Sequence, residues 1–301
     1  MHRAVVLGSR FGGLAVQTWL RRLYPPSDLH ITVIDQWHNV VFRPGLVHAA
    51  DQHPAHLVEA LTVQLEPFWR RRQVEFVHDI VVAVDPERRQ VHTATHGPAS
   101  YDVLFIATGA TPLWDAIPGM DTRRRGICEG YLARHAAVQF TRGEPGRYVF
   151  AMAPLEAPSH WNPRPRVGCE CPLFETALLW DARLRKLQKR REATLTIVTP
   201  ASVIAEQAGK KGQDQLGKML ADRDVAVITH AQYHSVSDRS LVIGGRTLPF
   251  DHIVWIPGMG GSRWLIDSGV ADDEGWVPVT DYLQHPQWPT IYAVGDIISR
   301  P

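Results

Sequence analysis

The stretch Gly8-Ser9-Arg10-Phe11-Gly12-Gly13 decides the fold of this 301-residue chain. It follows an apolar run from Arg3 to Leu7, typical of a buried strand, and it precedes apolar residues that recur at helical spacing. A second strand is expected from His30 to Ile34, closed by Asp35. The helix is expected to bury one face, formed by Val16, Trp19, Leu20 and Leu23. A strand, a helix and a second strand in this order make a βαβ unit, which requires a parallel sheet.

The same stretch has the context of a dinucleotide-binding turn. The N-terminus of a helix carries partial positive charge and free N–H groups, so a pyrophosphate can bind there, and Asp35 can accept hydrogen bonds from ribose hydroxyls. Arg10 stands where the pattern normally has its middle glycine, and its guanidinium could instead lie against the pyrophosphate. The alternative is a degenerate turn that binds nothing.

The order of elements in the first half recurs in the second half. The βαβ unit is followed by three short β runs, Val74–Val77, Ile80–Val84 and Gln90–Thr93. A buried strand, Tyr101–Ala107, comes next and ends at Thr108-Gly109. The second half begins with a strand, a helix and another strand, at Tyr148–Met152, Leu173–Lys189 and Leu195–Val198. Three short β runs follow, at Val225–Ile228, His234–Val236 and Leu241–Ile243. A buried strand, Phe250–Ile256, comes last. A repeat of this length predicts two similar α/β domains.

One more apolar strand, Thr290–Val294, ends at Gly295-Asp296 and is expected to return to the first sheet. The predicted fold is therefore α/β, with two Rossmann-like three-layer domains of which the first is discontinuous. The first domain is expected to comprise residues 1–112 and 263–301, and the second residues 113–262.

Composition narrows the classes of function. The formal net charge is +1, which implies no general attraction to nucleic acid. No secretory signal is recognisable, and no apolar stretch approaches the roughly 18 residues of a membrane span. We therefore predict a cytoplasmic, soluble protein, with peripheral contact at the cytoplasmic membrane as the other possibility; a homo-oligomer is also compatible.

The second half lacks a dinucleotide fingerprint. Its first strand is followed by Ala153-Pro154-Leu155-Glu156-Ala157-Pro158, and its second by Thr199-Pro200, with no acid for a ribose. This pattern argues against an NADH dehydrogenase or an NADPH-linked disulfide reductase.

Two of the 3 cysteines, Cys169 and Cys171, stand where the second long helix begins, since Pro172 suits a first helical turn. A helix N-terminus stabilises a thiolate, which is the form that attacks sulfur or a flavin carbon. The alternative is a pair of buried small hydrophobic residues. A zinc site is not expected, because Cys-x-Cys offers only two ligands, and no metal is predicted.

Taken together, these motifs resemble the FAD-binding pattern of the pyridine nucleotide-disulfide oxidoreductase superfamily. The resemblance implies that the fingerprint, the ends of three strands and the segment beside the isoalloxazine bind FAD. The implied cofactor residues are Gly8, Arg10, Phe11, Gly12, Gly13, Asp35, Gln36, Arg43, Pro44, Val81, Ala107, Thr108, Gly109, Gly295 and Asp296.

Within that superfamily, the chain resembles the sulfide:quinone oxidoreductases and flavocytochrome c sulfide dehydrogenases. Gly168-Cys169-Glu170-Cys171-Pro172-Leu173-Phe174-Glu175 looks like their Cys-x-Gly-Pro-x-x-Glu stretch, with Cys169 at the redox cysteine, and Gly126-Ile127-Cys128-Glu129 looks like another cysteine-bearing segment. The resemblance implies that sulfide or a small thiol passes electrons through Cys169 to FAD, and that a quinone or protein acceptor reoxidises the flavin. Cys128 or Cys171 would be the partner of Cys169, and Cys128 is geometrically the better candidate.

The sequence departs from that family in three ways. No cysteine is found near Ala271, where the family has its third cysteine, and the family's proton-transfer histidines fall on Leu132 and Glu206. The sequence ends at Pro301, whereas the family continues with part of the flavin cover, the quinone pocket and membrane-binding helices. These departures leave two alternatives open, namely a non-catalytic dinucleotide-binding protein and an NADH:quinone reductase-like flavoprotein.

Overall fold

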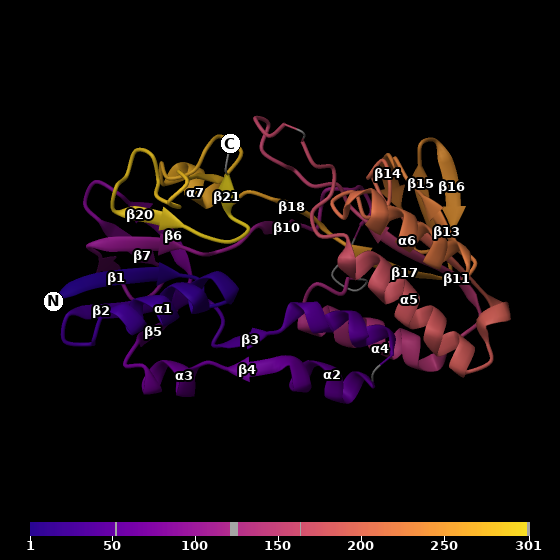
Figure 1. Cartoon of the computed structure of the whole chain (residues 1–301), viewed down its shortest axis with the longest axis horizontal. Coiled ribbons are helices and arrows are strands. Elements are labelled where there is room, and N and C mark those ends of the chain that lie inside the picture. The colour runs from indigo at the N-terminus through magenta and orange to yellow at the C-terminus, as the bar shows by residue number, and fades with distance from the viewer. Residues whose placement is uncertain (52, 121–125, 163, 300–301) are drawn as a thin grey trace.

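The computed structural model describes residues 1–51, 53–120, 126–162 and 164–299 and shows two α/β lobes side by side (Figure 1). The first lobe contains a five-stranded parallel sheet in the order β20-β9-β1-β2-β5. Its strands are β1 (His2–Leu7), β2 (Leu29–Asp35), β5 (Glu75–His78), β9 (Val103–Ile106) and β20 (Ile291–Ala293). The pairing of β20 with β9 confirms that the last long strand returns to the first sheet.

Alternate residues of β1 supply the two faces of this sheet. Val5 and Leu7 belong to one apolar cluster, whereas Ala4 and Val6 belong to the cluster on the other face. Helix α1 (Phe11–Leu23) packs on the second cluster, and α3 (Glu66–Arg71) contributes Trp69 to it. The lobe is thus a parallel sheet with apolar layers on both sides, as a parallel sheet requires.

The predicted buried face of α1 is partly wrong. Val16 and Leu20 pack on the core, but Trp19 is 59% exposed and Leu23 is 67% exposed. Gly13 and Gln17 are the buried residues of this helix instead. Gly13 lets the helix lie against the glycine turn, which rotates Trp19 to the outside, where the guanidinium of Arg22 lies 5.0 Å from its ring.

The second lobe repeats the plan of the first. Its parallel sheet has the order β13-β12-β11-β17, which matches β5-β2-β1-β9 strand for strand. The strands are β11 (Gly146–Met152), β12 (Ala193–Val198), β13 (Val225–Ile228) and β17 (His252–Ile256), and the helices are α4 (Gly130–Arg142), α5 (Cys171–Lys186), α6 (Gly209–Ala221) and the short η3 (Arg190–Glu192). This architecture confirms the predicted α/β class with two Rossmann-like units; the domain boundaries stay a prediction.

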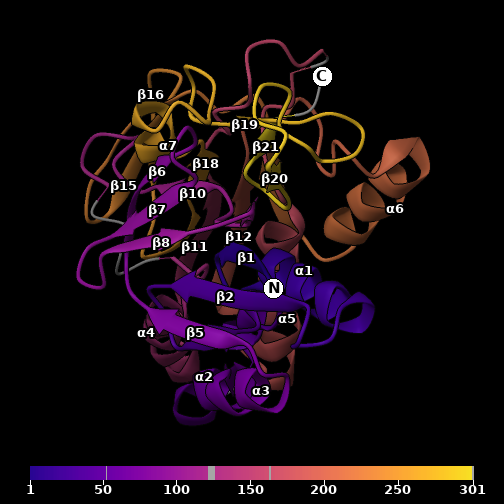
Figure 2. The ribbon, with the colours of Figure 1, turned by 90° about the vertical axis from the view of Figure 1, so that its left-hand side faces the viewer.

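A small antiparallel sheet accompanies each large one, and it contains two of the three short β runs predicted in each half. The first comprises β6 (Val81–Asp85), β7 (Gln90–Thr93) and β8 (Pro98–Ser100), and the second β14 (Tyr233–Val236), β15 (Ser240–Ile243) and β16 (Arg246–Pro249). Figure 2 shows the first of them above β1 and β2.

Two further features connect the lobes. The strands β10 (Thr111–Leu113) and β18 (Gly258–Gly260) form an antiparallel pair between them. An extension of the first lobe reaches α4 of the second; it contains β3 (Asn39–Val41), η1 (Arg43–Ala50), α2 (Pro54–Leu61) and β4 (Thr62–Gln64). The remaining elements, α7 (Arg263–Asp267), β19 (Val277–Pro278) and β21 (Ile298–Ser299), complete the first lobe.

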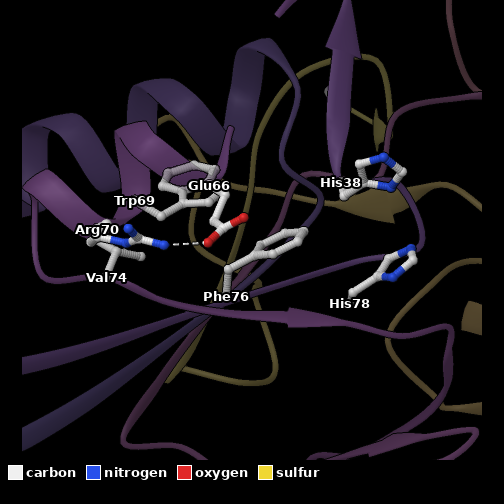
Figure 3. A pocket seen from close by; sticks show the side chains of 7 residues that line it. All are labelled: His38, Glu66, Trp69, Arg70, Val74, Phe76 and His78. Carbon is white, nitrogen blue, oxygen red and sulfur yellow. Dashed lines mark hydrogen bonds and ion pairs between the residues drawn. The ribbon is translucent and has the colours of Figure 1, made fainter. Parts of the chain in front are cut away.

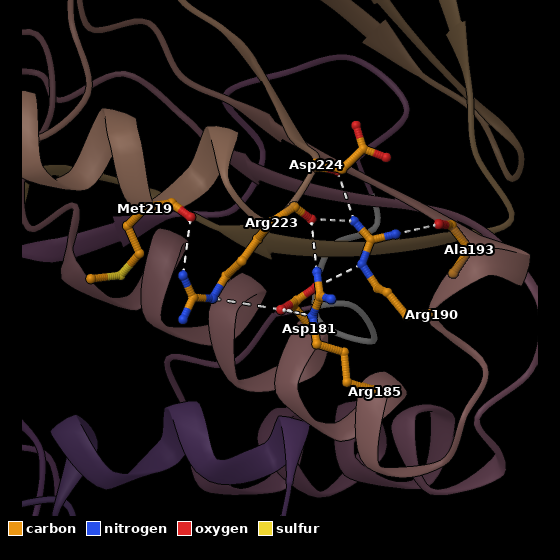
Figure 4. Close-up of polar contacts among 7 residues, drawn as sticks. All are labelled: Asp181, Arg185, Arg190, Ala193, Met219, Arg223 and Asp224. Atoms are coloured by element: carbon orange, nitrogen blue, oxygen red, sulfur yellow. Dashed lines mark hydrogen bonds and ion pairs between the residues drawn. The ribbon is translucent and has the colours of Figure 1, made fainter.

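A buried carboxylate, Asp181 on α5, is surrounded by arginines (Figure 4). Its Oδ1 accepts a hydrogen bond of 2.6 Å from Arg190 Nε, and its Oδ2 accepts one of 2.9 Å from Arg185 Nε. Arg223 Nε lies 3.7 Å from the same Oδ2. Arg190 also donates to the carbonyls of residues 193, 223 and 224. The cluster therefore fixes α5 to β12 and to the turn before β13.

We expect the substitution Asp181→Asn to destabilise the protein by about 3 kcal/mol, because it leaves the largely buried guanidinium of Arg190 without its carboxylate. Chemical denaturation followed by circular dichroism measures the change. The matched control is Asp214→Asn, which breaks an exposed pair with Lys210 and is expected to cost less than about 0.5 kcal/mol. Equal effects of the two substitutions would show that the Asp181 cluster does not stabilise the fold.

Candidate functional site

The glycine turn, the end of β9 and the end of β20 meet at the carboxyl edge of the first sheet. Gly8 has a left-handed φ of +97°, and a Cβ on it would lie 2.5 Å from the carbonyl oxygen of Ala107. A Cβ on Gly12 would lie 3.1 Å from Cγ2 of Val294. Only residues without side chains fit this closely at Gly8. Segments that are distant in the sequence, 8–13, 107–109 and 294–296, therefore lie together.

The start of α1 is suited to an anion. Gly13 approaches the turn so closely that a Cβ would lie 1.9 Å from the carbonyl oxygen of Gly8. No side chain caps the helix, since Arg10 occupies the N-cap position without a capping hydrogen bond. The first N–H groups of a helix lack intrahelical acceptors, so this uncapped end can bind a phosphate group. The residues present thus fit the pyrophosphate of a dinucleotide.

Asp35 lies at the end of β2 beside the turn. Its Oδ2 accepts hydrogen bonds from the backbone N–H of Ser9 at 2.6 Å and from Ser9 Oγ at 2.7 Å, and its Oδ1 accepts one from the N–H of Trp37 at 2.9 Å. The sequence analysis missed Ser9, which is fully buried. Ser9 holds the carboxylate against the turn, so a ribose hydroxyl and Ser9 would both donate hydrogen bonds to Asp35.

The other predicted cofactor residues are distributed along the same lobe. The carbonyl of Gln36 accepts a hydrogen bond from His78, and Val81 opens β6. Thr108 and Asp296 are exposed and follow β9 and β20, and Gly109 and Gly295 have left-handed φ angles. Pro44 lies in the first turn of η1, and Phe11 is exposed, with its ring 6.0 Å from that of Phe42. Their role in binding FAD stays a prediction.

Arg10 and Arg43 face one carboxylate, Glu129. A hydrogen bond joins Arg43 Nη2 to Glu129 Oε1, and Arg10 Nη2 lies 3.7 Å from Glu129 Oε2. Glu129 is the N-cap residue of α4 and directly follows Cys128. Glu129 is not among the predicted site residues, because nothing in a linear pattern indicates a partner from the other lobe.

The three cysteines lie near one another. Cys128 is half-buried, and burial raises the pKa of its thiol to about 12, with the nearby charges of Arg43, Glu129 and Cys169 as smaller influences. Cys169 and Cys171 are exposed, and Cys169 is a hydrogen-bond partner of Cys171. Cys169 thus has both candidate partners in its neighbourhood.

The expectation that the helix start lowers thiol pKa values is wrong for Cys171. Helix α5 does begin at Cys171 after the N-cap residue Glu170, with Pro172 in its first turn. Burial, however, raises the pKa of Cys171, and the negative charges of Cys169 and Glu175 raise it further. Burial is thus the main cause, and the neighbouring negative charges add to it.

In the second lobe, the segments that follow β11 and β12 bond to other parts of the protein chain. Glu170 is buried, and its Oε2 accepts a hydrogen bond of 2.7 Å from the N–H of Glu206 in the loop after β12. Burial raises the pKa of Glu170. The segment after β11 pairs with the chain near β18, where Glu156 N–H donates to the carbonyl of Met259 at 2.9 Å. That this lobe cannot hold NAD(P)H in the usual manner stays a prediction.

A hollow of about 470 Å³ lies on the edge strand β5 of the first lobe, away from the cysteines (Figure 3). It is lined by His38, Glu66, Trp69, Arg70, Val74, Phe76 and His78. None of the predicted site residues lines it. In the part of the chain that the structure describes, no three His, Cys, Asp or Glu side chains form a metal site, and no helix is both long and apolar enough to span a membrane.

Comparison with known proteins identifies the family. The pattern of the pyridine nucleotide-disulphide oxidoreductase family matches residues 2–139 and 174–301. The sulfide-quinone reductase of Aquifex aeolicus is 26% identical over 310 residues, which cover 99% of this chain and 68% of that protein. The mouse mitochondrial sulfide:quinone oxidoreductase is 23% identical over 314 residues, covering 100% of this chain and 66% of that protein. The chain thus spans about two thirds of the length of these relatives.

Other comparisons broaden the picture. An NADH dehydrogenase-like protein of Mycobacterium tuberculosis, MT1860, is 27% identical over 317 residues, which cover 99% of this chain and 73% of that protein. The crystal structure of the Aquifex aeolicus sulfide:quinone oxidoreductase superposes with a TM-score of 0.88 at 24% identity, covering 100% of this chain and 70% of that chain. This similarity confirms the fold. The match to the family covers both lobes and confirms the resemblance to the superfamily: the chain belongs to the pyridine nucleotide-disulphide oxidoreductase family and is an FAD-dependent oxidoreductase.

Proposed function

We propose that this flavoprotein oxidises sulfide or a small thiol through Cys169 and passes the electrons to FAD, from which a quinone or another acceptor takes them. The observation that carries this proposal is the grouping of Cys128, Cys169 and Cys171 around the start of α5. The likeness to two sulfide:quinone oxidoreductases along nearly the whole chain supports the same donor.

Each of the cysteines can take one role in the oxidation of sulfide. In the oxidised protein, Cys169 would share a disulfide with Cys128 or Cys171. A hydrosulfide ion attacks the sulfur of Cys169, the S–S bond breaks, and the partner leaves as a thiolate, so Cys169 carries a persulfide. FAD, when bound, supplies a two-electron acceptor for this thiolate. Overall, sulfide loses two electrons and one proton and remains as sulfane sulfur.

The cofactor would be held at the carboxyl edge of the first sheet. The start of α1 would bind the pyrophosphate, Asp35 a ribose, and Asp296 the ribityl and phosphate region. Arg43 and Pro44 would lie beside the isoalloxazine, on the side where the second lobe presents Cys128 and Cys169. The insertion before α5 is tied to the first lobe, because Ser159 N–H donates to Glu274 Oε2 at 2.7 Å and His160 Nε2 lies 2.9 Å from Ser299 Oγ.

A second candidate function is NADH oxidation, since an NADH dehydrogenase-like protein is among the relatives. NADH would need a site in the second lobe. That lobe has no glycine turn after β11, and Glu170 binds the loop after β12 instead. We therefore expect NADH to be a poor donor.

Anaerobic reduction of the purified, FAD-loaded protein tests the proposal. Sulfide in slight excess is expected to bleach the flavin absorbance, whereas the same concentration of NADH is expected to bleach it at least about 100-fold more slowly. Faster bleaching by NADH would favour the second candidate. A flavin that neither donor reduces would exclude both functions.

A further inference from the structure

Glu129 has two guanidinium partners that it holds unequally. Arg43 donates a direct hydrogen bond to Oε1, whereas Arg10 Nη2 stays 3.7 Å from Oε2, beyond hydrogen-bond length. The side chain of Arg10 is 30% exposed, so it has room to move. Arg43 is thus the main partner of Glu129, and Arg10 is attracted by the charge of Glu129 and, more weakly, by that of Asp35.

Arg10 and Arg43 lie among two carboxylates, that of Glu129 and, with a weaker influence on Arg10, that of Asp35. Within the described residues the buried Nε of Arg43 has no hydrogen-bond acceptor. Burial and the positive charge of Arg43 lower the pKa of Arg10, although both carboxylates act in the opposite direction. An arginine nevertheless remains protonated at neutral pH, so Arg10 can exchange a carboxylate for another anion.

Arg10 is also the residue from which α1 starts. As the N-cap residue of a helix that no side chain caps, it lies beside the backbone N–H groups that would receive a pyrophosphate. Its guanidinium can therefore turn either toward Glu129 on the second lobe or toward an anion at the helix start. In the structure it is turned toward Glu129.

We propose that Glu129 and the diphosphate of FAD compete for Arg10, so that Glu129 sets the affinity for the cofactor. The inference rests on the proposed cofactor site at the start of α1. Arg10 replaces the middle glycine of the fingerprint, and Glu129 is the residue that draws this side chain away from the site until FAD arrives. When FAD binds, Arg10 exchanges the carboxylate for the diphosphate, and Glu129 keeps Arg43.

The test is a double-mutant cycle on the dissociation constant of FAD, measured by titrating apoprotein and following the quenching of flavin fluorescence. The four proteins are wild type, Glu129→Gln, Arg10→Gly and the double variant. We expect Glu129→Gln to tighten FAD binding about tenfold, because Arg10 no longer has a competing carboxylate. In the Arg10→Gly background, the same substitution is expected to change the affinity by about twofold or less.

A matched control removes a different carboxylate, one that pairs with an arginine of α4. Glu59 of α2 is hydrogen-bonded to Arg134 of α4, and this pair does not include the dinucleotide turn. The substitution Glu59→Gln changes the net charge equally and is expected to leave FAD affinity within about twofold. The melting temperature of each apoprotein shows whether a variant is folded before its affinity is compared.

Two sets of results would overturn the inference. If Glu129→Gln weakens FAD binding, or tightens it equally with and without Arg10, the competition does not exist, although the cofactor site stands because FAD still binds. If none of the four folded proteins binds FAD, the proposed cofactor site is wrong and the inference falls with it.

Discussion

Replacing Cys169 with alanine is expected to abolish reduction of the flavin by sulfide, lowering the rate at least about 1,000-fold, because the sulfur that receives the nucleophile is lost. FAD binding and the melting temperature should not change, since Cys169 is exposed and its side chain is not part of the core. Stopped-flow absorbance under anaerobic conditions measures the rate, and the flavin spectrum confirms that the variant is loaded.

Variants of the two neighbouring cysteines identify the partner of Cys169. If Cys128 is the partner, Cys128→Ala lowers the rate as strongly as Cys169→Ala, and Cys171→Ala changes it little; the opposite ranking assigns Cys171. The high pKa of Cys128 means that its thiol is protonated when reduced, so its role as a leaving thiolate depends on the charge of Arg43. A Cys169→Ala variant that is still reduced by sulfide at the wild-type rate would remove Cys169 from the proposed pathway.

A methyl group on Gly13 is expected to prevent FAD binding and to destabilise the protein by more than about 4 kcal/mol. The Cβ of Gly13→Ala would lie 1.9 Å from the carbonyl oxygen of Gly8, and neither backbone segment can move without opening the turn. The start of α1 would shift away from the position that receives the pyrophosphate. Differential scanning calorimetry and FAD titration measure the two effects.

Gly217 offers a control for this substitution. It also lies within a helix, α6, but nothing would lie within 4 Å of a Cβ placed on it. The change Gly217→Ala is therefore expected to stabilise the protein by about 0.5–1 kcal/mol, since alanine has the higher helix propensity. If Gly13→Ala were as well tolerated as Gly217→Ala, the close packing of the glycine turn would not be needed for the fold.

The sequence contains enough information to predict the architecture because both halves show the same periodicities in the same order. The strand from Tyr101 and the strand from Phe250 occupy equivalent places beside β1 and β11. The run before Gly295-Asp296 pairs with β9, as the order of motifs indicates. Apolar alternation and glycine turns involve residues close together in the sequence, so they can be recognised from the sequence alone.

Features that depend on contacts between distant segments were not predictable in the same way. The exposure of Trp19 follows from how closely Gly13 lets α1 approach the turn. The pairing of Arg10 with Glu129 needs both lobes, and the raised pKa of Cys171 depends on Cys169 and Glu175 beside it as well as on burial. The hydrogen bonds from Ser9 to Asp35 could not be predicted either, because serine and aspartate are common in loops of many kinds.

The position of β20 has a consequence for how the polypeptide acquires its structure. Leu104 of β9 is paired with Ile291 of β20, so the edge of the first sheet is completed by a strand that the ribosome makes after the entire second lobe. Contacts between such remote positions form slowly, because a long loop must close first. We expect the second lobe to become protected from hydrogen exchange during synthesis while β9 is paired with β1 alone, which leaves one edge of the first sheet open in nascent chains until β20 emerges.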